Sequence, residues 1–250
     1  MNLKKTRITD IILIIILVIS TGVLSYTVKR PRSFWYPVYG GMTAELEDSD
    51  FYEDMISGKS FCFAGDSITY GTETGGVTWY DPIVRYIKGD ISNFSYGGWT
   101  SETLASKAGE IPVADIYVIA IGINDALFSD DALGAVTPEE YISNLEILTG
   151  TLTANNPDAK FYFITPWIFF DYPAHINKLR DDFSDALINW CDNNSRICID
   201  PYRVTLSIIE SEGRDRFMFN SFHPNGTRGV GLFSYAVLYS SHQARIDGVY

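Results

Sequence analysis

Short apolar runs alternate with segments of helical periodicity between residues 58 and 240. The apolar runs predict β-strands at 61–64, 116–121, 161–165 and 197–199, and a further short strand is predicted at 91–95. Apolar residues at helical spacing predict helices at 79–87, 138–152, 176–190 and 229–240. The run 116–121 is apolar on both faces, which is typical of a central strand in a parallel sheet. The alternation therefore predicts an α/β fold, a three-layer α/β/α sandwich around a mostly parallel sheet of about five strands.

Two local signals refine this picture. Thr137 precedes Pro138 and is followed three residues later by Glu140, a spacing that predicts a capping box at the start of the helix 138–152. In a parallel sheet covered by helices, the functional residues lie in loops beyond the carboxyl ends of the strands. The residues that follow each predicted strand are therefore the first place to look for chemistry.

The amino terminus carries a long apolar segment. Residues 8–28 are 21 residues with a single charge, Asp10, and three basic residues come before them. At about 1.5 Å per residue, this length crosses a hydrocarbon layer about 30 Å thick. We predict a cytoplasmic tail and an uncleaved single-pass transmembrane helix at 1–28, a linker at 29–50, and a catalytic domain at 51–250 outside the cell membrane. A cleaved signal peptide, which would leave the domain secreted, and a buried core helix are the alternatives.

Composition narrows the class of partner and of cofactor. Hydrophobic residues make up 46% of the chain and charged residues 20%, which is typical of a protein with a packed core. Of the 19 basic and 31 acidic residues, six and one lie in 1–32, which leaves a net charge of −17 for 33–250. A surface that acidic disfavours nucleic acid as a partner.

Cysteine, histidine and glycine patterns indicate no metal and no cofactor. The three cysteines and three histidines show no zinc-site spacing. The glycine-rich segment 71–76 lacks the Gly-Lys-Ser/Thr ending of a phosphate loop. Cys62 falls in the first strand, where we expect it to be buried and inert, and a disulfide between Cys191 and Cys198 stays open for an extracellular domain.

Four short motifs follow predicted strands or lie in a late loop. They are Gly-Asp-Ser at 65–67, Gly98 within Asn-Phe-Ser-Tyr-Gly-Gly at 93–98, Gly-Ile-Asn-Asp at 122–125, and His-Pro-Asn at 223–225. In this order they resemble the SGNH (GDSL) family of serine esterases and acylhydrolases, over about residues 58–240. The resemblance implies the flavodoxin-like fold of that family and an ester hydrolase without a cofactor.

The resemblance also implies roles for individual residues. Ser67 would be the nucleophile and His223 the general base. The backbone N–H groups of Ser67 and Gly98 and the side-chain amide of Asn124 would form the oxyanion hole. Two supporting residues, Asp66 and Asp125, would accept backbone N–H bonds and fix the loops.

One position departs from the family pattern. Most members have an aspartate three residues before the histidine, and this chain has Asn220. An amide oxygen can orient His223, but an amide that presents its NH₂ group favours the wrong tautomer. We expect Asn220 or a backbone carbonyl to orient His223. Asp215 is the nearest other carboxylate, and we expect the adjacent Arg214 and Arg216 to engage it.

The substrate is left open by the sequence. Aromatic residues after the strands suit sugar rings and acyl chains alike, and we select Tyr70, Trp99 and Trp167 as substrate contacts. By analogy with anchored members of the family, we expect the removal of O-acyl groups, acetyl above all, from cell-surface carbohydrate through an acyl-serine intermediate. The alternatives are an O-acyltransferase that acts on polysaccharide and a non-catalytic carbohydrate-binding domain.

Overall fold

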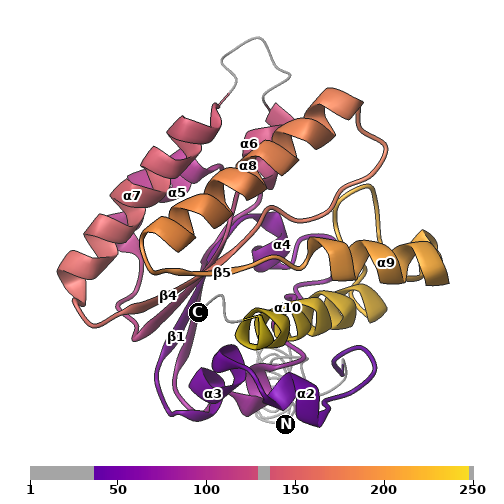
Figure 1. The fold of residues 1–250 in the computed structure, drawn as a ribbon, viewed down its shortest axis with the longest axis horizontal. Helices are drawn as coiled ribbons and strands as arrows, with labels where there is room; N and C mark the ends of the chain where they lie inside the picture. The colour runs from indigo at the N-terminus through magenta and orange to yellow at the C-terminus, as the bar shows by residue number, and fades with distance from the viewer. Residues whose placement is uncertain (1–36, 129–135, 248–250) are drawn as a thin grey trace, which may run out of the picture. The chain divides into compact units, whose positions relative to one another are not determined.

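A computed structural model describes residues 37–128 and 136–247, and five parallel strands form one sheet there (Figure 1). The strand order is β2-β1-β3-β4-β5. The strands are β1 (Phe61–Gly65), β2 (Ile91–Ser95), β3 (Ile116–Ala120), β4 (Lys160–Ile164) and β5 (Ile197–Ile199). Each lies within a residue or two of its predicted position, so the parallel sheet of five strands is confirmed.

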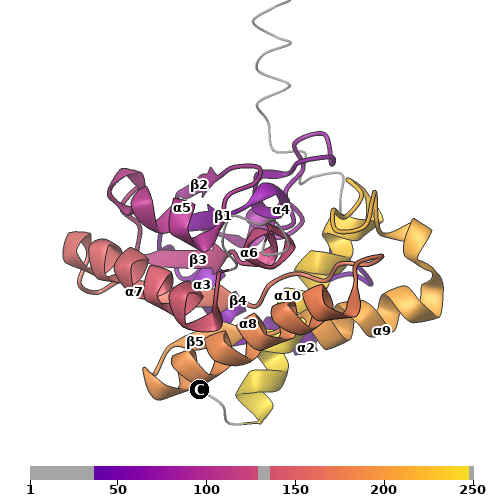
Figure 2. The ribbon, with the colours of Figure 1, turned by 90° about the horizontal axis from the view of Figure 1, so that it is seen from above.

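Helices cover both faces of the sheet, as Figures 1 and 2 show. One layer consists of α5 (Ser101–Ser106), α6 (Ile123–Phe128), α7 (Pro138–Asn155) and α8 (Ala174–Asn193). The other consists of α2 (Ala44–Glu47), α3 (Asp50–Ile56), α9 (Tyr202–Glu212) and α10 (Arg228–Ile246). The three-layer prediction is confirmed, and so is the capping box, in which Thr137 and Glu140 bond to each other's backbone N–H groups.

The central strands end level with one another. Gly65 of β1 lies opposite Ser95 of β2 and Ala120 of β3, so the loops that follow these strands leave the sheet at one edge. A Cβ atom on Gly65 would lie 2.2 Å from the Ala120 carbonyl oxygen, so only glycine fits at this point. The short helix α4 (Ser67–Tyr70) begins two residues after Gly65 and packs against β2.

The helix predicted at 79–87 is wrong. Only Val84–Tyr86 is helical, as a single 3₁₀ turn, and the residues before it form turns. The Ile83 N–H donates to the Tyr80 carbonyl at 2.9 Å, while the Trp79 carbonyl accepts from the Ser234 hydroxyl of α10. The Trp79 carbonyl therefore accepts a tertiary hydrogen bond instead of the Ile83 N–H bond that an α-helix would form. Trp79 and Ile83 are still fully buried, which explains their apolar spacing.

Part of the segment predicted as a linker packs against the domain. In the described part of 29–50, Val38 and Leu46 are buried, and the Tyr39 N–H donates to the Gly231 carbonyl of α10 at 3.0 Å. Two short helices, α2 and α3, continue this packing. The amino-terminal end of the domain therefore lies against its last helix.

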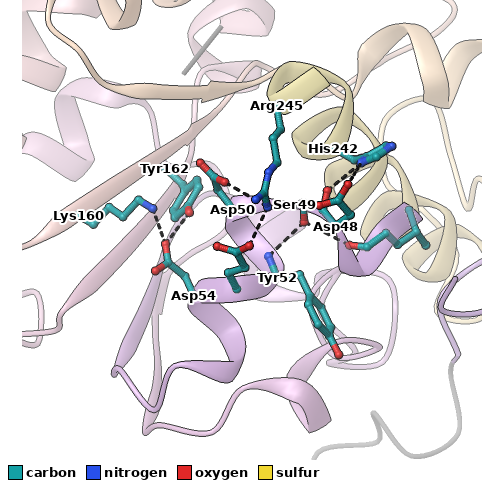
Figure 3. A network of polar contacts seen from close by, with 11 residues as sticks. Asp48, Ser49, Asp50, Tyr52, Asp54, Lys160, Tyr162, His242 and Arg245 are labelled. Atoms are coloured by element: carbon teal, nitrogen blue, oxygen red, sulfur yellow. Dashed lines mark hydrogen bonds and ion pairs between the residues drawn. The ribbon is translucent and has the colours of Figure 1, made fainter. Parts of the chain in front are cut away.

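A network of ion pairs and hydrogen bonds joins these ends (Figure 3). Arg245 near the end of α10 lies 2.8 Å from Glu53, 3.5 Å from Asp48 and 3.6 Å from Asp50. The His242 Nδ1–H donates to the Asp48 carbonyl at 2.7 Å. These contacts bring α3 and the turn before it against α10, and we refer to them as the terminal seam.

Two further expectations concern the membrane and the cysteines. No helix within 37–128 and 136–247 is both long enough and apolar enough to cross a membrane, and the predicted span 8–28 lies outside these residues. No disulfide joins Cys62, Cys191 and Cys198 in the part of the chain that the structure describes. Cys62 is fully buried, as predicted, and burial raises the pKa of its thiol to about 11.

Candidate active site

Ser67 and His223 meet at the edge of the sheet although 156 residues separate them. Ser67 is the first residue of α4, and Asp66 caps this helix by accepting the Ile68 N–H at 2.9 Å. The Ser67 Oγ lies 2.9 Å from His223 Nε2, and both residues are buried. The geometry is that of a nucleophile beside its base.

The loop that carries His223 is held from outside. The Phe170 N–H donates to the Ser221 carbonyl at 2.8 Å, and the Ser221 hydroxyl donates to Asp171 at 3.0 Å. Arg214 lies 2.7 Å from the same Asp171 carboxylate. The expectation that Asp215 engages the two arginines is therefore wrong for Arg214.

Arg216, the second of these arginines, pairs with Glu212 at 2.7 Å. Glu212 lies one turn earlier at the end of α9, within reach of an i,i+4 pair. Both arginines thus find partners that lie on other elements, and they fix the loop before His223 from two sides.

Asn220 determines which nitrogen of His223 carries the proton. Its Oδ1 accepts the backbone N–H groups of Phe222 at 3.0 Å and of His223 at 2.7 Å. Its Nδ2 therefore faces His223 Nδ1, at 3.0 Å. An amide nitrogen only donates, so Nδ1 accepts and the proton of the neutral ring is on Nε2. In this tautomer Nε2 donates to Ser67 and cannot take its proton.

Burial and the carboxylate of Glu73 shift the pKa of His223 in opposite directions. Burial lowers the pKa of its imidazole below the ordinary value, and the charge of Glu73 opposes this by raising it. Glu73 has a left-handed backbone, with φ of 62°. It belongs to the loop 71–77, which packs against the His223 loop: a Cβ on Gly226 would lie 2.4 Å from the Thr74 carbonyl oxygen.

The three donors predicted for the oxyanion hole come from the start of α4, from the loop after β2 and from α6. Within the described residues, the N–H groups of Ser67 and Gly98 have no hydrogen-bond acceptor, which leaves both free for an oxyanion. Gly98 has φ of 79°, which favours glycine, and open space where a side chain would be. The Asn124 amide donates one of its two N–H groups to the Trp99 carbonyl at 2.8 Å. Its second N–H is the one that would donate to an oxyanion.

Asp66 and Asp125 accept backbone N–H bonds, as predicted. Both oxygens of Asp125 lie 3.0 Å from the Ser101 nitrogen and so fix the start of α5. Asp66 is fully buried, and its Oδ2 has no hydrogen-bond partner within the described residues. Burial raises the pKa of Asp66 to about 7 and also raises that of Asp125.

The three predicted substrate contacts lie in different environments. Tyr70 is 48% exposed and comes three residues after Ser67. Trp99 is half-buried and comes directly after Gly98. Trp167 is 2% exposed, and its ring stacks on Phe233 with centroids 4.6 Å apart, so it belongs to the core and its prediction as a substrate contact is wrong.

Sequence reasoning missed two residues near the site. Tyr96 lies within the motif 93–98, whose tyrosine between the strand and two glycines was a usable signal. Glu73 lies in the glycine-rich segment 71–76, which the sequence excludes as a phosphate loop. Within the described residues, no group of three or more His, Cys, Asp and Glu side chains could hold a metal ion.

Comparisons with known proteins give a family for this chain. The model of the GDSL-like lipase/acylhydrolase family matches residues 63–227. A search of curated proteins gives no match.

Solved structures share the fold at low sequence identity. A GDSL-like lipase from Parabacteroides merdae is 15% identical with a TM-score of 0.63, over 77% of this chain and 97% of its own. An acetylxylan esterase from Geobacillus stearothermophilus is 17% identical with a TM-score of 0.62, over 75% and 95%. An alpha/beta hydrolase from the Lake Arreo metagenome is 17% identical with a TM-score of 0.62, over 74% and 95%.

Proposed function

The chain belongs to the GDSL-like lipase/acylhydrolase family and is an ester-hydrolysing enzyme, and we propose that it removes O-acetyl groups from carbohydrate through an acyl-Ser67 intermediate. The observation that carries the proposal is the 2.9 Å contact between Ser67 Oγ and His223 Nε2 beside unoccupied N–H donors. The small acyl group and the sugar are argued from the similarity to an acetylxylan esterase and from the exposed aromatic residues at the site.

The first half of the reaction forms the acyl-enzyme. Ser67 Oγ bonds to the ester carbonyl carbon as its proton passes to His223 Nε2. The carbonyl oxygen becomes an oxyanion, and the N–H groups of Ser67, Gly98 and Asn124 stabilise it. The C–O bond to the sugar then breaks, and the sugar oxygen takes the proton from His223.

The second half uses water in place of Ser67. His223 Nε2 accepts a proton from water as the water oxygen bonds to the acyl carbon. The bond to Ser67 Oγ breaks, Ser67 recovers a proton, and acetate leaves. Both halves require an unprotonated Nε2, so the proton of the neutral ring must first move to Nδ1.

Asn220 opposes this change of tautomer. For Nδ1–H to find an acceptor, the Asn220 amide has to turn and give up the hydrogen bonds from Phe222 and His223 to its oxygen. The site is therefore expected to turn over slowly compared with an aspartate-containing site. The same observation favours a second candidate function, a carbohydrate-binding domain with little hydrolytic activity.

We further propose that residues 8–28 anchor the domain to a membrane with the site outside, so that the carbohydrate is a cell-surface polymer. An O-acyltransferase would use the same acyl-Ser67 but release it to a sugar hydroxyl. Analysis of products with an oligosaccharide acceptor separates the two: acetate rises for a hydrolase, and acetylated acceptor accumulates without acetate for a transferase.

The experiment that tests the proposal follows aryl acetate hydrolysis by residues 33–250 and by Ser67→Ala. We expect the rate of Ser67→Ala to fall to background, because the Ser67 hydroxyl is the group that contacts His223 Nε2. Ser184→Ala, a buried serine on α8 that bonds to the Arg180 carbonyl, is the matched control and should keep the rate. Equal background rates from the folded parent chain and Ser67→Ala would contradict the hydrolase proposal and favour the carbohydrate-binding domain.

A further inference from the structure

Three aromatic side chains form a row beside the nucleophile. Tyr70 comes from α4, three residues after Ser67, and Tyr96 and Trp99 come from the loop after β2. The ring centroids of Tyr70 and Tyr96 are 5.5 Å apart, and those of Tyr96 and Trp99 are 5.9 Å apart. We call these three residues the aromatic strip. Tyr70 is 48% exposed and Tyr96 57%, so both rings are open to solvent.

The strip is held in place by the site. The Tyr96 N–H donates to the Gly65 carbonyl at 3.3 Å, and the Trp99 N–H donates to the Tyr96 carbonyl at 3.4 Å. The Trp99 carbonyl accepts the Asn124 amide, and the Trp99 ring packs on Phe94 with centroids 5.4 Å apart. These contacts fix the backbone of Tyr96 and Trp99 and the ring of Trp99 before any ligand arrives, which lowers the entropy lost on binding.

Two features identify the occupant. Tyrosine and tryptophan present flat apolar faces with a polar edge, which complements a sugar ring with a C–H face and hydroxyl groups around it. The net charge of −17 for residues 33–250 disfavours anionic polymers and anionic lipid surfaces. The spacing between neighbouring rings is also comparable to the length of one sugar unit in a chain.

We propose that the aromatic strip binds a neutral oligosaccharide chain and leads its acyl-bearing sugar to Ser67. The inference rests on the proposed function, because it assigns the carbohydrate side of the ester to this strip. Tyr96 is the central ring, in contact with both others, and is the residue whose loss should matter most.

The test measures binding apart from turnover. Xylohexaose and chitohexaose are titrated by calorimetry into the chain with Ser67→Ala, which cannot hydrolyse an ester. We expect Tyr96→Ala, added to Ser67→Ala, to weaken binding about 3- to 10-fold, the range that loss of an aromatic stacking contact gives. Tyr96→Phe keeps the ring and should retain most of the affinity. Val113→Ala, a 63% exposed residue before β3 at the opposite edge of the sheet, is the matched control and should change nothing.

A Tyr96→Leu variant separates sugar from acyl chain. Leucine keeps apolar area but loses the flat face, so it should weaken oligosaccharide binding as much as alanine does. In the parent chain, each of Tyr96→Ala and Tyr96→Leu should lower the ratio of kcat/KM for an acetylated oligosaccharide to kcat/KM for an aryl acetate by the same 3- to 10-fold.

Three results would overturn the strip proposal. They are no binding of either oligosaccharide at millimolar concentration, equal binding with and without Tyr96→Ala, and full oligosaccharide binding by Tyr96→Leu with a lowered rate on a long-chain aryl ester. The last would assign the strip to acyl chains. Because binding is measured without Ser67, a failure of the hydrolase proposal leaves these readouts intact.

Discussion

Replacing Asn220 by aspartate should convert the resting tautomer of His223 into the reactive one. One carboxylate oxygen can keep the backbone N–H groups of Phe222 and His223, as Asn220 Oδ1 does now. The second oxygen then occupies the place of Nδ2, 3.0 Å from His223 Nδ1. A carboxylate oxygen accepts only, so Nδ1 must carry the proton and Nε2 becomes free to take the proton of Ser67.

The magnitude follows from the hydrogen bonds at stake. In the parent chain, the Asn220 amide has to give up two backbone hydrogen bonds to turn, at about 1 kcal/mol each. A barrier about 2 kcal/mol higher lowers a rate about 30-fold. Aspartate also stabilises the imidazolium by its charge. In a serine protease, replacing the triad aspartate by asparagine removes both this charge and the correct tautomer and lowers kcat about 10⁴-fold. Asn220→Asp should therefore raise kcat for aryl acetate by about 30-fold to about 10⁴-fold.

The assay pairs turnover with a direct readout of the ring proton. Steady-state rates are measured at pH 8, where the imidazole is neutral, and the ¹⁵N shifts of His223 report which nitrogen is protonated. We expect the proton on Nε2 in the parent chain and on Nδ1 in Asn220→Asp. Asn225→Asp adds the same charge to the same loop, where its side chain bonds to Thr227 and Gly229 instead, and should not raise the rate. A proton already on Nδ1 in the parent, with kcat of a folded Asn220→Asp within threefold of it, would refute the reasoning.

Three further predictions concern other parts of the site. Asn124→Ala should lower kcat by about 10²- to 10³-fold with a smaller effect on KM, because an oxyanion donor acts in the transition state; a change in KM alone, in steady-state kinetics, would contradict this role. Glu73→Gln should move the acid limb of the kcat/KM profile to lower pH, because the Glu73 charge raises the pKa of His223. Glu139→Gln on α7 is the control, and an unmoved limb in Glu73→Gln would exclude an effect of Glu73 on His223. Asp66 has a pKa of about 7 in the fold against an ordinary 3.8, so the fold holds a proton that the unfolded chain has released, and the free energy of unfolding should fall as pH rises from 4 to 7. Urea unfolding at a series of pH values should show a shallower decline for Asp66→Asn, and an unchanged decline would assign it to other groups.

The strands and the residues that follow them were predictable because their signals are local. Apolar runs of four to six residues mark β1, β3 and β4, and a parallel sheet brings the carboxyl ends of its strands to one edge. Ser67 and Asn124 each come three residues after the end of such a run. Their meeting with His223 followed from the family motif and the topology together.

The orientation of Asn220 was not predictable, because it depends on backbone atoms. The choice between its oxygen and its nitrogen is made by two N–H groups, those of Phe222 and His223, which point at it only once the turn has formed. The position of Glu73 depends in the same way on the packing of Thr74 against Gly226, two loops that are far apart in the chain. Trp167 looked like a pocket residue because it follows a strand, and it is buried because Phe233 of α10 covers it.

The terminal seam makes the two ends of the domain one unit of local unfolding. Helices α2 and α3 at the start and α10 at the end hold each other through Arg245, His242 and the acidic residues around them (Figure 3). Exposed ion pairs contribute little singly, so the buried residues of α10 stabilise the terminal seam as well. A change at Arg245 therefore acts on residues 48–53 as well, although Glu53 lies 192 positions away in the chain.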